Sequence, residues 1–130
     1  MKISLLVLAS PYASQSADTA WHYAQAAAHA GHELYRVFFY HEAVYHGSRL
    51  SVPAQDEIDR VQRWAELAER SGAELVLCVA SALKRGILDD TEANRYERGA
   101  HSIHPAFVIA GLGQLVDASV HSDRLLTFGG

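Results

Sequence analysis

Short apolar runs alternate with amphipathic stretches along the chain, and this alternation restricts the fold more than any other feature of the sequence. Five runs predict strands, namely Ile3–Ala9, Glu33–Tyr40, Leu75–Val79, Phe107–Ala110 and Arg124–Phe128. The stretches between them predict helices over about 17–30, from Pro53 to Gly72, from about Ser81, from about Thr91 and over 111–122, with a polar loop over 41–52. Strands that alternate with helices imply right-handed crossovers. We therefore expect an α/β fold with three layers (α/β/α), in which helices cover both faces of a mostly parallel five-stranded sheet.

The length and composition fit a single domain. The chain has 130 residues, near the commonest domain size, and 49% of them are hydrophobic. This apolar content is enough for one core and excludes an intrinsically disordered chain. We therefore expect residues 1–130 to form one domain.

The charge balance argues against direct binding to nucleic acid. The 15 acidic and 11 basic residues give a formal net charge of −4, whereas proteins that hold nucleic acid by its phosphates normally carry a basic face. The sequence also has no apolar run near the ~20 residues that a membrane-spanning helix needs. No direct nucleic-acid contact and no membrane association are expected.

The N-terminal run and the cysteine count together favour the cytoplasm. The run Ile3–Ala9 is short enough for the apolar part of a signal peptide, but no clear cleavage site closes it and a helix-start pattern follows, which favours a strand. Cys78 is the one cysteine of the chain and cannot form an internal disulfide, as expected in a reducing cytosol.

Residues that can support chemistry follow several of the predicted strands. In parallel sheets, ligands and reacting groups gather at the carboxyl ends of the strands. Those ends are Ser10–Tyr12, Tyr40–His41, Cys78–Ser81 and Gly111–Gly113.

Cys78 is the strongest candidate among them, because the cysteine thiolate is a good nucleophile towards sulfur. A helix that begins directly after Cys78 would point backbone N–H groups and the positive end of its dipole at the sulfur, and Lys84 and Arg85 would add positive charge nearby. The alternative is an inert residue that fills the core, since free cysteine is among the most buried residue types.

The loop Ser10–Ser16 supports a different hypothesis. Its hydroxyl groups could cradle a phosphate, as in flavin-binding doubly wound domains. The glycines of a dinucleotide fingerprint or a P-loop are missing, however, and a helix cap explains the loop more simply. A flavin- or nucleotide-binding module stays an alternative function.

Eight histidines are many for this length, and most of them are expected at the surface. His101 and His104 are the tightest pair, but no neighbouring group completes a zinc site, so we expect no metal and no cofactor. His41 differs because it follows the second strand, at the edge expected to hold Cys78. There it could accept a proton or donate a hydrogen bond to the sulfur, with Tyr40 and Ser81 as further supporting candidates.

Several segments resemble the TusD/DsrE family of small sulfurtransferase subunits. They are Val37–Tyr45 (VFFYHEAVY), Cys78–Ile87 (CVASALKRGI), Ser102–Pro105 with Gly111–Leu115, and Asp123–Leu125 before the last strand. The resemblance runs from the first strand to the C-terminus, and the segment after the cysteine is its most specific part.

This resemblance implies a DsrEFH-like fold and a sulfurtransferase that carries sulfur as a persulfide on Cys78. It also implies a heterohexamer with TusB/TusC-like or DsrF/DsrH-like sister subunits. A TusA-like donor and a TusE-like acceptor would serve 2-thiolation of the wobble uridine of tRNA. A DsrC-like acceptor would instead serve sulfur oxidation, and a non-catalytic scaffold subunit with a buried Cys78 is the remaining alternative.

Overall fold

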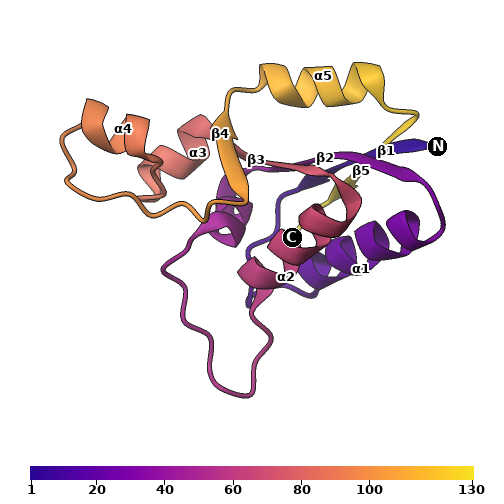
Figure 1. Ribbon diagram of the computed structural model, residues 1–130, viewed down its shortest axis with the longest axis horizontal. Helices are drawn as coiled ribbons and strands as arrows, with labels where there is room; N and C mark the ends of the chain where they lie inside the picture. The colour runs from indigo at the N-terminus through magenta and orange to yellow at the C-terminus, as the bar shows by residue number, and fades with distance from the viewer.

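The computed structural model describes residues 1–130 and contains one five-stranded sheet with helices on both faces (Figure 1). The strands are β1 (Lys2–Val7), β2 (Glu33–Phe39), β3 (Glu74–Cys78), β4 (Phe107–Ala110) and β5 (Arg124–Phe128). The helices are α1 (Gln15–His29), the 3-10 helix η1 (His41–Gly47), α2 (Arg60–Ser71), α3 (Val79–Lys84), α4 (Asp90–Arg95) and α5 (Gly113–His121). All neighbouring strands pair in parallel, in the order β4-β3-β2-β1-β5. The predicted three-layer fold is confirmed, with a sheet that is parallel throughout.

The two faces of the sheet are covered unequally. Helices α1 and α2 lie against one face, whereas α5 alone lies along the other (Figure 1). Because side chains alternate between the faces of a strand, the α1/α2 side receives the main core of 21 buried residues. In that core the Phe39 and Trp64 rings meet edge to face with centroids 5.3 Å apart. Phe38, Val76 and Cys78 form a smaller buried cluster on the α5 side.

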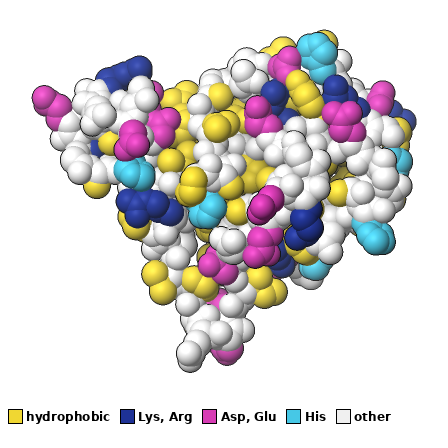
Figure 2. Space-filling model, in the orientation of Figure 1, with side chains coloured by type: hydrophobic (Ala, Val, Ile, Leu, Met, Phe, Trp, Pro, Cys, Tyr) yellow, Lys and Arg dark blue, Asp and Glu magenta, His cyan; other side chains and the backbone are white.

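The thin α5 layer leaves apolar side chains exposed. Val116 and Val120 on the outer side of α5 are 61% and 70% exposed, and Val108 on the edge strand β4 is also exposed. Figure 2 shows hydrophobic side chains gathered between α5 and the α3–α4 region. The molecule therefore has an apolar surface on the same side of the sheet as Cys78. None of its helices is long and apolar enough to cross a membrane.

Local capping fixes where α1 and α2 begin and end. The Ser14 side chain accepts a hydrogen bond from the Ser16 N–H (3.2 Å), and the Asp59 carboxylate accepts one from the Gln62 N–H (3.0 Å). Gly72 ends α2 with φ +77°, a left-handed conformation that glycine adopts without steric cost. Because Asp59 is the cap, α2 starts at Arg60 and not after Pro53. Ile58 lies before the helix and is 52% exposed.

The prediction of a polar loop over 41–52 was wrong for its first half. Residues His41–Gly47 form η1, and three of its side chains are buried, those of Ala43, Val44 and His46. Gly47 allows this close packing, since a Cβ there would lie 2.5 Å from Leu77 Cδ1. Similarly, β3 ends at Cys78, and α3 begins at Val79 instead of near Ser81.

Candidate functional site

Cys78 lies at the junction between a central strand and a helix. It is the last residue of β3 and the residue before α3, with an extended backbone (φ −60°, ψ 124°). This is the position that the sequence predicts, at the carboxyl edge of the sheet. The side chain is only 3% exposed in the isolated chain, however, so its sulfur is not freely accessible there.

Apolar side chains surround Cys78. It belongs to the buried cluster with Phe38 and Val76, and four half-buried side chains pack against this cluster, those of Leu6, Tyr40, Ala110 and Leu115. The covering groups are themselves partly exposed, so Cys78 lies just below the surface and not deep in the main core. A sulfur-exchange reaction at Cys78 requires its sulfur to become accessible, because rates of such exchange depend on access to the attacking thiol.

The three supporting candidates lie at the same edge of the sheet. The Ser81 hydroxyl is buried and accepts a hydrogen bond from the His41 N–H at 3.1 Å. His41 has φ +53°, a left-handed conformation that is uncommon outside glycine and is often found at functional sites. Its ring, which is exposed, lies 4.1 Å from the Tyr40 ring between centroids. Tyr40 therefore connects His41 to the cluster that contains Cys78.

Arg85, one of the two basic residues expected near Cys78, forms an ion pair with Glu42. Arg85 Nε and Nη2 donate to one carboxylate oxygen of Glu42 at 2.9 and 2.7 Å, and Nη1 donates to the Ser81 carbonyl at 3.1 Å. Glu42 thus compensates the charge of Arg85, which we had expected to act on the thiolate. The sequence pattern did not indicate this pair, which joins η1 to α3.

The loop after β1 is explained by helix capping. Ser14 caps α1, and the Ser10 hydroxyl donates to the Pro11 carbonyl at 3.4 Å. Gly130 packs so closely on this loop that a Cβ there would lie 2.8 Å from the Ala9 Cβ. The structure gives the loop no feature that favours the flavin or nucleotide hypothesis. Two surface hollows, of about 720 and 510 Å³, lie along α2, and neither is lined by this loop or by Cys78.

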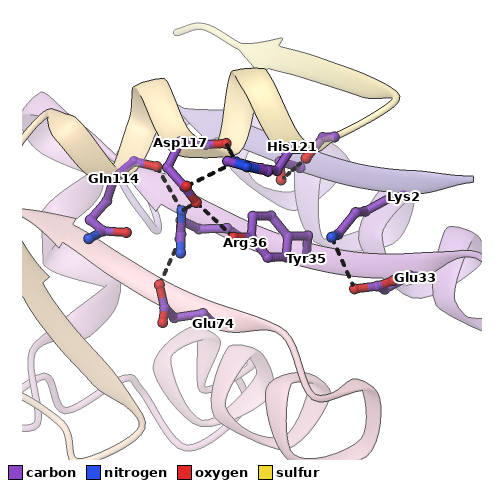
Figure 3. Close-up of polar contacts among 10 residues, drawn as sticks. Lys2, Glu33, Tyr35, Arg36, Glu74, Gln114, Asp117 and His121 are labelled. Carbon is purple, nitrogen blue, oxygen red and sulfur yellow. Dashed lines mark hydrogen bonds and ion pairs between the residues drawn. The ribbon is translucent and has the colours of Figure 1, made fainter.

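Beneath α5 lies a polar cluster that the sequence analysis did not find (Figure 3). The Arg36 side chain is only 7% exposed; its Nε donates to Glu74 at 2.6 Å and its Nη1 to Asp117 at 2.7 Å. The Tyr35 hydroxyl donates to the same Asp117 oxygen at 2.7 Å. The hydrogen bond from Tyr35, and after it the bond from Arg36, lowers the pKa of Asp117 because both stabilise the carboxylate. The same bond to Asp117 raises the pKa of Tyr35.

Two further ionisable groups are perturbed on the α1/α2 side of the sheet. Hydrogen bonds from Arg60 and Arg63 lower the pKa of Asp18 to about 2, although partial burial opposes them. Burial lowers the pKa of His46 to about 4; its Nε2 lies 3.2 Å from the Ala9 carbonyl, and its Nδ1 has no partner. His46 is therefore an exception to the expected surface position of the histidines. No three His, Cys, Asp or Glu side chains gather as a metal site would require.

Comparisons with known proteins give a consistent result. Residues 1–128 match the model of the DsrE/DsrF-like family. The chain is 50% identical over 129 residues to a protein of Allochromatium vinosum named "Putative sulfurtransferase DsrE", with 99% of both chains covered. It is 41% identical over 128 residues to "Sulfurtransferase TusD" of Klebsiella pneumoniae, with 98% of this chain and 100% of that protein covered. The crystal structure of the E. coli YchN protein has the same fold, with a TM-score of 0.75, 22% identity and coverage of 98% and 99%.

Proposed function

This chain belongs to the DsrE/DsrF-like family, and on that basis we propose that it is a sulfurtransferase subunit that carries sulfur as a persulfide on Cys78. One observation carries the proposal. The single cysteine of the chain stands at the carboxyl end of a central parallel strand, directly before a helix, under a thin apolar cover. That edge is where parallel sheets place their chemistry.

The reaction consists of two exchanges at sulfur. The Cys78 thiolate attacks the outer sulfur of a donor persulfide, a new S–S bond forms at Cys78, and the donor leaves as a thiolate. An acceptor thiolate then attacks the outer sulfur on Cys78, and the Cys78 thiolate is released. The overall transfer is redox-neutral, since one persulfide bond forms for each one that breaks.

Three neighbouring residues have supporting roles in this proposal. The exposed His41 ring can accept a proton or donate a hydrogen bond at the edge of the sheet that holds Cys78. Ser81 fixes His41 in its left-handed conformation through the 3.1 Å hydrogen bond, and Tyr40 lies between the His41 ring and the Cys78 cluster. We assign Ser81 and Tyr40 to positioning, because neither is needed to accept sulfur.

The proposed pathway is the cytoplasmic sulfur relay that forms 2-thiouridine at the wobble position of tRNA. The partners in it are TusB/TusC-like sister subunits in a heterohexamer, a TusA-like donor and a TusE-like acceptor. The exposed apolar surface at Val108, Val116 and Val120 supports association with sister subunits. The acidic net charge is consistent with a subunit that passes sulfur on without holding tRNA itself.

The second candidate is a DsrE-type subunit that delivers sulfur to a DsrC-like acceptor in sulfur oxidation, with DsrF/DsrH-like sister subunits. A specific observation favours it, because the identity to the DsrE relative is 50% and that to the TusD relative is 41%. Both candidates use the same cysteine and the same exchange.

A transfer assay tests the proposal and separates the two pathways. The chain, assembled with its sister subunits, is loaded with a persulfide donor, freed of donor, and offered TusE-like or DsrC-like acceptor protein. We expect sulfur on the acceptor with wild-type chain and none with Cys78→Ser, which lacks any thiol but keeps a side chain of similar size. Equal transfer by Cys78→Ser would refute the proposal. The faster acceptor identifies the pathway.

A further inference from the structure

We propose that α5 is a movable cover over Cys78, and that the contacts of Arg36 and Tyr35 with Asp117 hold this cover closed. In its closed position this cover limits access of other molecules to the thiol. Its consequence for sulfur transfer rests on the function proposed above.

The cover reaches the cysteine cluster through Leu115. Of the four half-buried side chains that pack against Phe38, Val76 and Cys78, only Leu115 comes from a helix. The others belong to β1, to β4 and to the residue that directly follows β2. Movement of α5 would therefore remove one wall of the cluster and leave the sheet intact.

Apolar packing holds α5 only weakly. Ala118 is its single buried residue, and Val116 and Val120 face away from the protein. Since hydrophobic stabilisation scales with the apolar area removed from water, such a helix gains little from contact with the sheet. Elements with few buried apolar contacts are those that open locally at low cost.

Polar contacts with β2 supply the attachment that apolar packing does not. Arg36 Nη1 donates to the Asp117 carboxylate at 2.7 Å and to the Gln114 carbonyl at 2.9 Å, and the Tyr35 hydroxyl donates to Asp117 at 2.7 Å (Figure 3). Glu74 on β3 holds the other side of the same guanidinium group. Gln114 and Asp117 flank Leu115 in the sequence, so these bonds fix the segment that covers the cysteine cluster.

The two ends of α5 differ in how firmly they are held. After its C-terminal end, the Asp123 N–H donates to the Lys2 carbonyl and the Lys2 N–H donates to the Asp123 carboxylate, both at 2.7 Å. The N-terminal end follows Gly111 and the exposed Leu112 and begins at Gly113. No atom lies within 4 Å of the position that a Cβ would take at Gly111 or Gly113. The N-terminal half can therefore swing outward about the Asp123 end once the contacts of Arg36 with Gln114 and Asp117, and that of Tyr35 with Asp117, break.

The rate at which iodoacetamide alkylates native Cys78 tests the proposal, because the chain contains no other thiol. In wild-type protein we expect alkylation much slower than that of a free cysteine. Asp117→Asn should accelerate it roughly 10-fold, because it removes the ion pair with Arg36 and leaves the Tyr35 bond without a charged partner. Tyr35→Phe, which removes one bond to the same carboxylate, should give a smaller acceleration, and Asp117→Glu should restore much of the protection.

Asp18→Asn is the matched control. It also breaks an aspartate–arginine pair, but that pair joins α1 to α2 on the other side of the sheet. We expect it to lower overall stability without exposing Cys78. Local opening also predicts that the alkylation rate of Asp117→Asn depends little on low urea concentrations, and that α5 amides exchange faster in that variant.

The proposal is overturned if Asp117→Asn reacts no faster than Asp18→Asn, if its reaction follows global unfolding in urea, or if wild-type Cys78 reacts as a free thiol. Alkylation needs no sulfur donor. A result in which Asp117→Asn reacts faster but wild-type chain never accepts sulfur would therefore support the cover and refute the proposed function.

Discussion

His46 gives a prediction about pH that follows directly from its burial. The ring is almost completely buried against Phe39 and Trp64, and its pKa falls from 6.5 to about 4. The pKa of this base is lower in the folded state than in the unfolded state. Between these two pKa values the unfolded chain binds a proton that the folded chain does not. The contribution of neutral His46 to the free energy of unfolding is therefore complete above about pH 6.5 and is lost as the pH falls towards about 4.

The size of the effect follows from the two pKa values. Each pH unit within this window costs about 1.4 kcal/mol. Allowing for incomplete titration at the ends, the loss between about pH 7.5 and about pH 5 is about 2 kcal/mol.

Urea unfolding of wild-type chain and of His46→Gln at these two pH values measures the effect. Glutamine can still donate a hydrogen bond to the Ala9 carbonyl but does not titrate. We expect His46→Gln to be less stable at the higher pH, because the aromatic packing is lost, but to lose about 2 kcal/mol less than wild type on acidification. His22→Gln, at an exposed position, should keep the wild-type pH dependence. Identical pH dependence in wild type and His46→Gln would refute the reasoning.

Two further predictions concern stability. Asp18→Asn should lower the free energy of unfolding at neutral pH by about 1–2 kcal/mol, because the Arg60 and Arg63 hydrogen bonds lower the pKa of Asp18 to about 2. This difference from wild type should shrink as the pH falls from about 4 to about 2, since Asp18 then becomes protonated in the folded chain. Urea unfolding at several acidic pH values measures the difference, and a difference that stays constant with pH would contradict the prediction. Gly47→Ala should cost about 1–3 kcal/mol in the same assay, because its Cβ would lie 2.5 Å from Leu77 Cδ1. Gly111→Ala, where nothing lies close, is the control and should change stability far less.

The fold could be predicted because it depends on strong local signals, and the family because segments such as Cys78–Ile87 resemble it. The apolar runs and amphipathic stretches have clear periods, and short-range caps such as Ser14 set helix ends. The predicted family is confirmed over residues 1–128, and the prediction of a sulfurtransferase is confirmed by the relatives that carry this name. The position of Cys78 at a strand end follows from the same periodicity.

What could not be predicted depends on contacts between distant residues. Arg36 and Asp117 are 81 positions apart, and an arginine inside a strand gives no indication of its partner. Leu115 packs against the cluster that contains Cys78, and the α5 sequence alone does not determine this contact. His46 was missed because its neighbours His41, Glu42 and Tyr45 suggest a polar segment, whereas Phe39 and Trp64 make a buried site for its ring.

Mass spectrometry of the assembled complex after incubation with a persulfide donor tests the central claim most directly. We expect the peptide that contains Cys78 to gain the mass of one sulfur atom, and to lose it on addition of either reductant or acceptor protein. A complex whose acceptor becomes loaded while the Cys78 peptide never carries the extra sulfur would contradict the account.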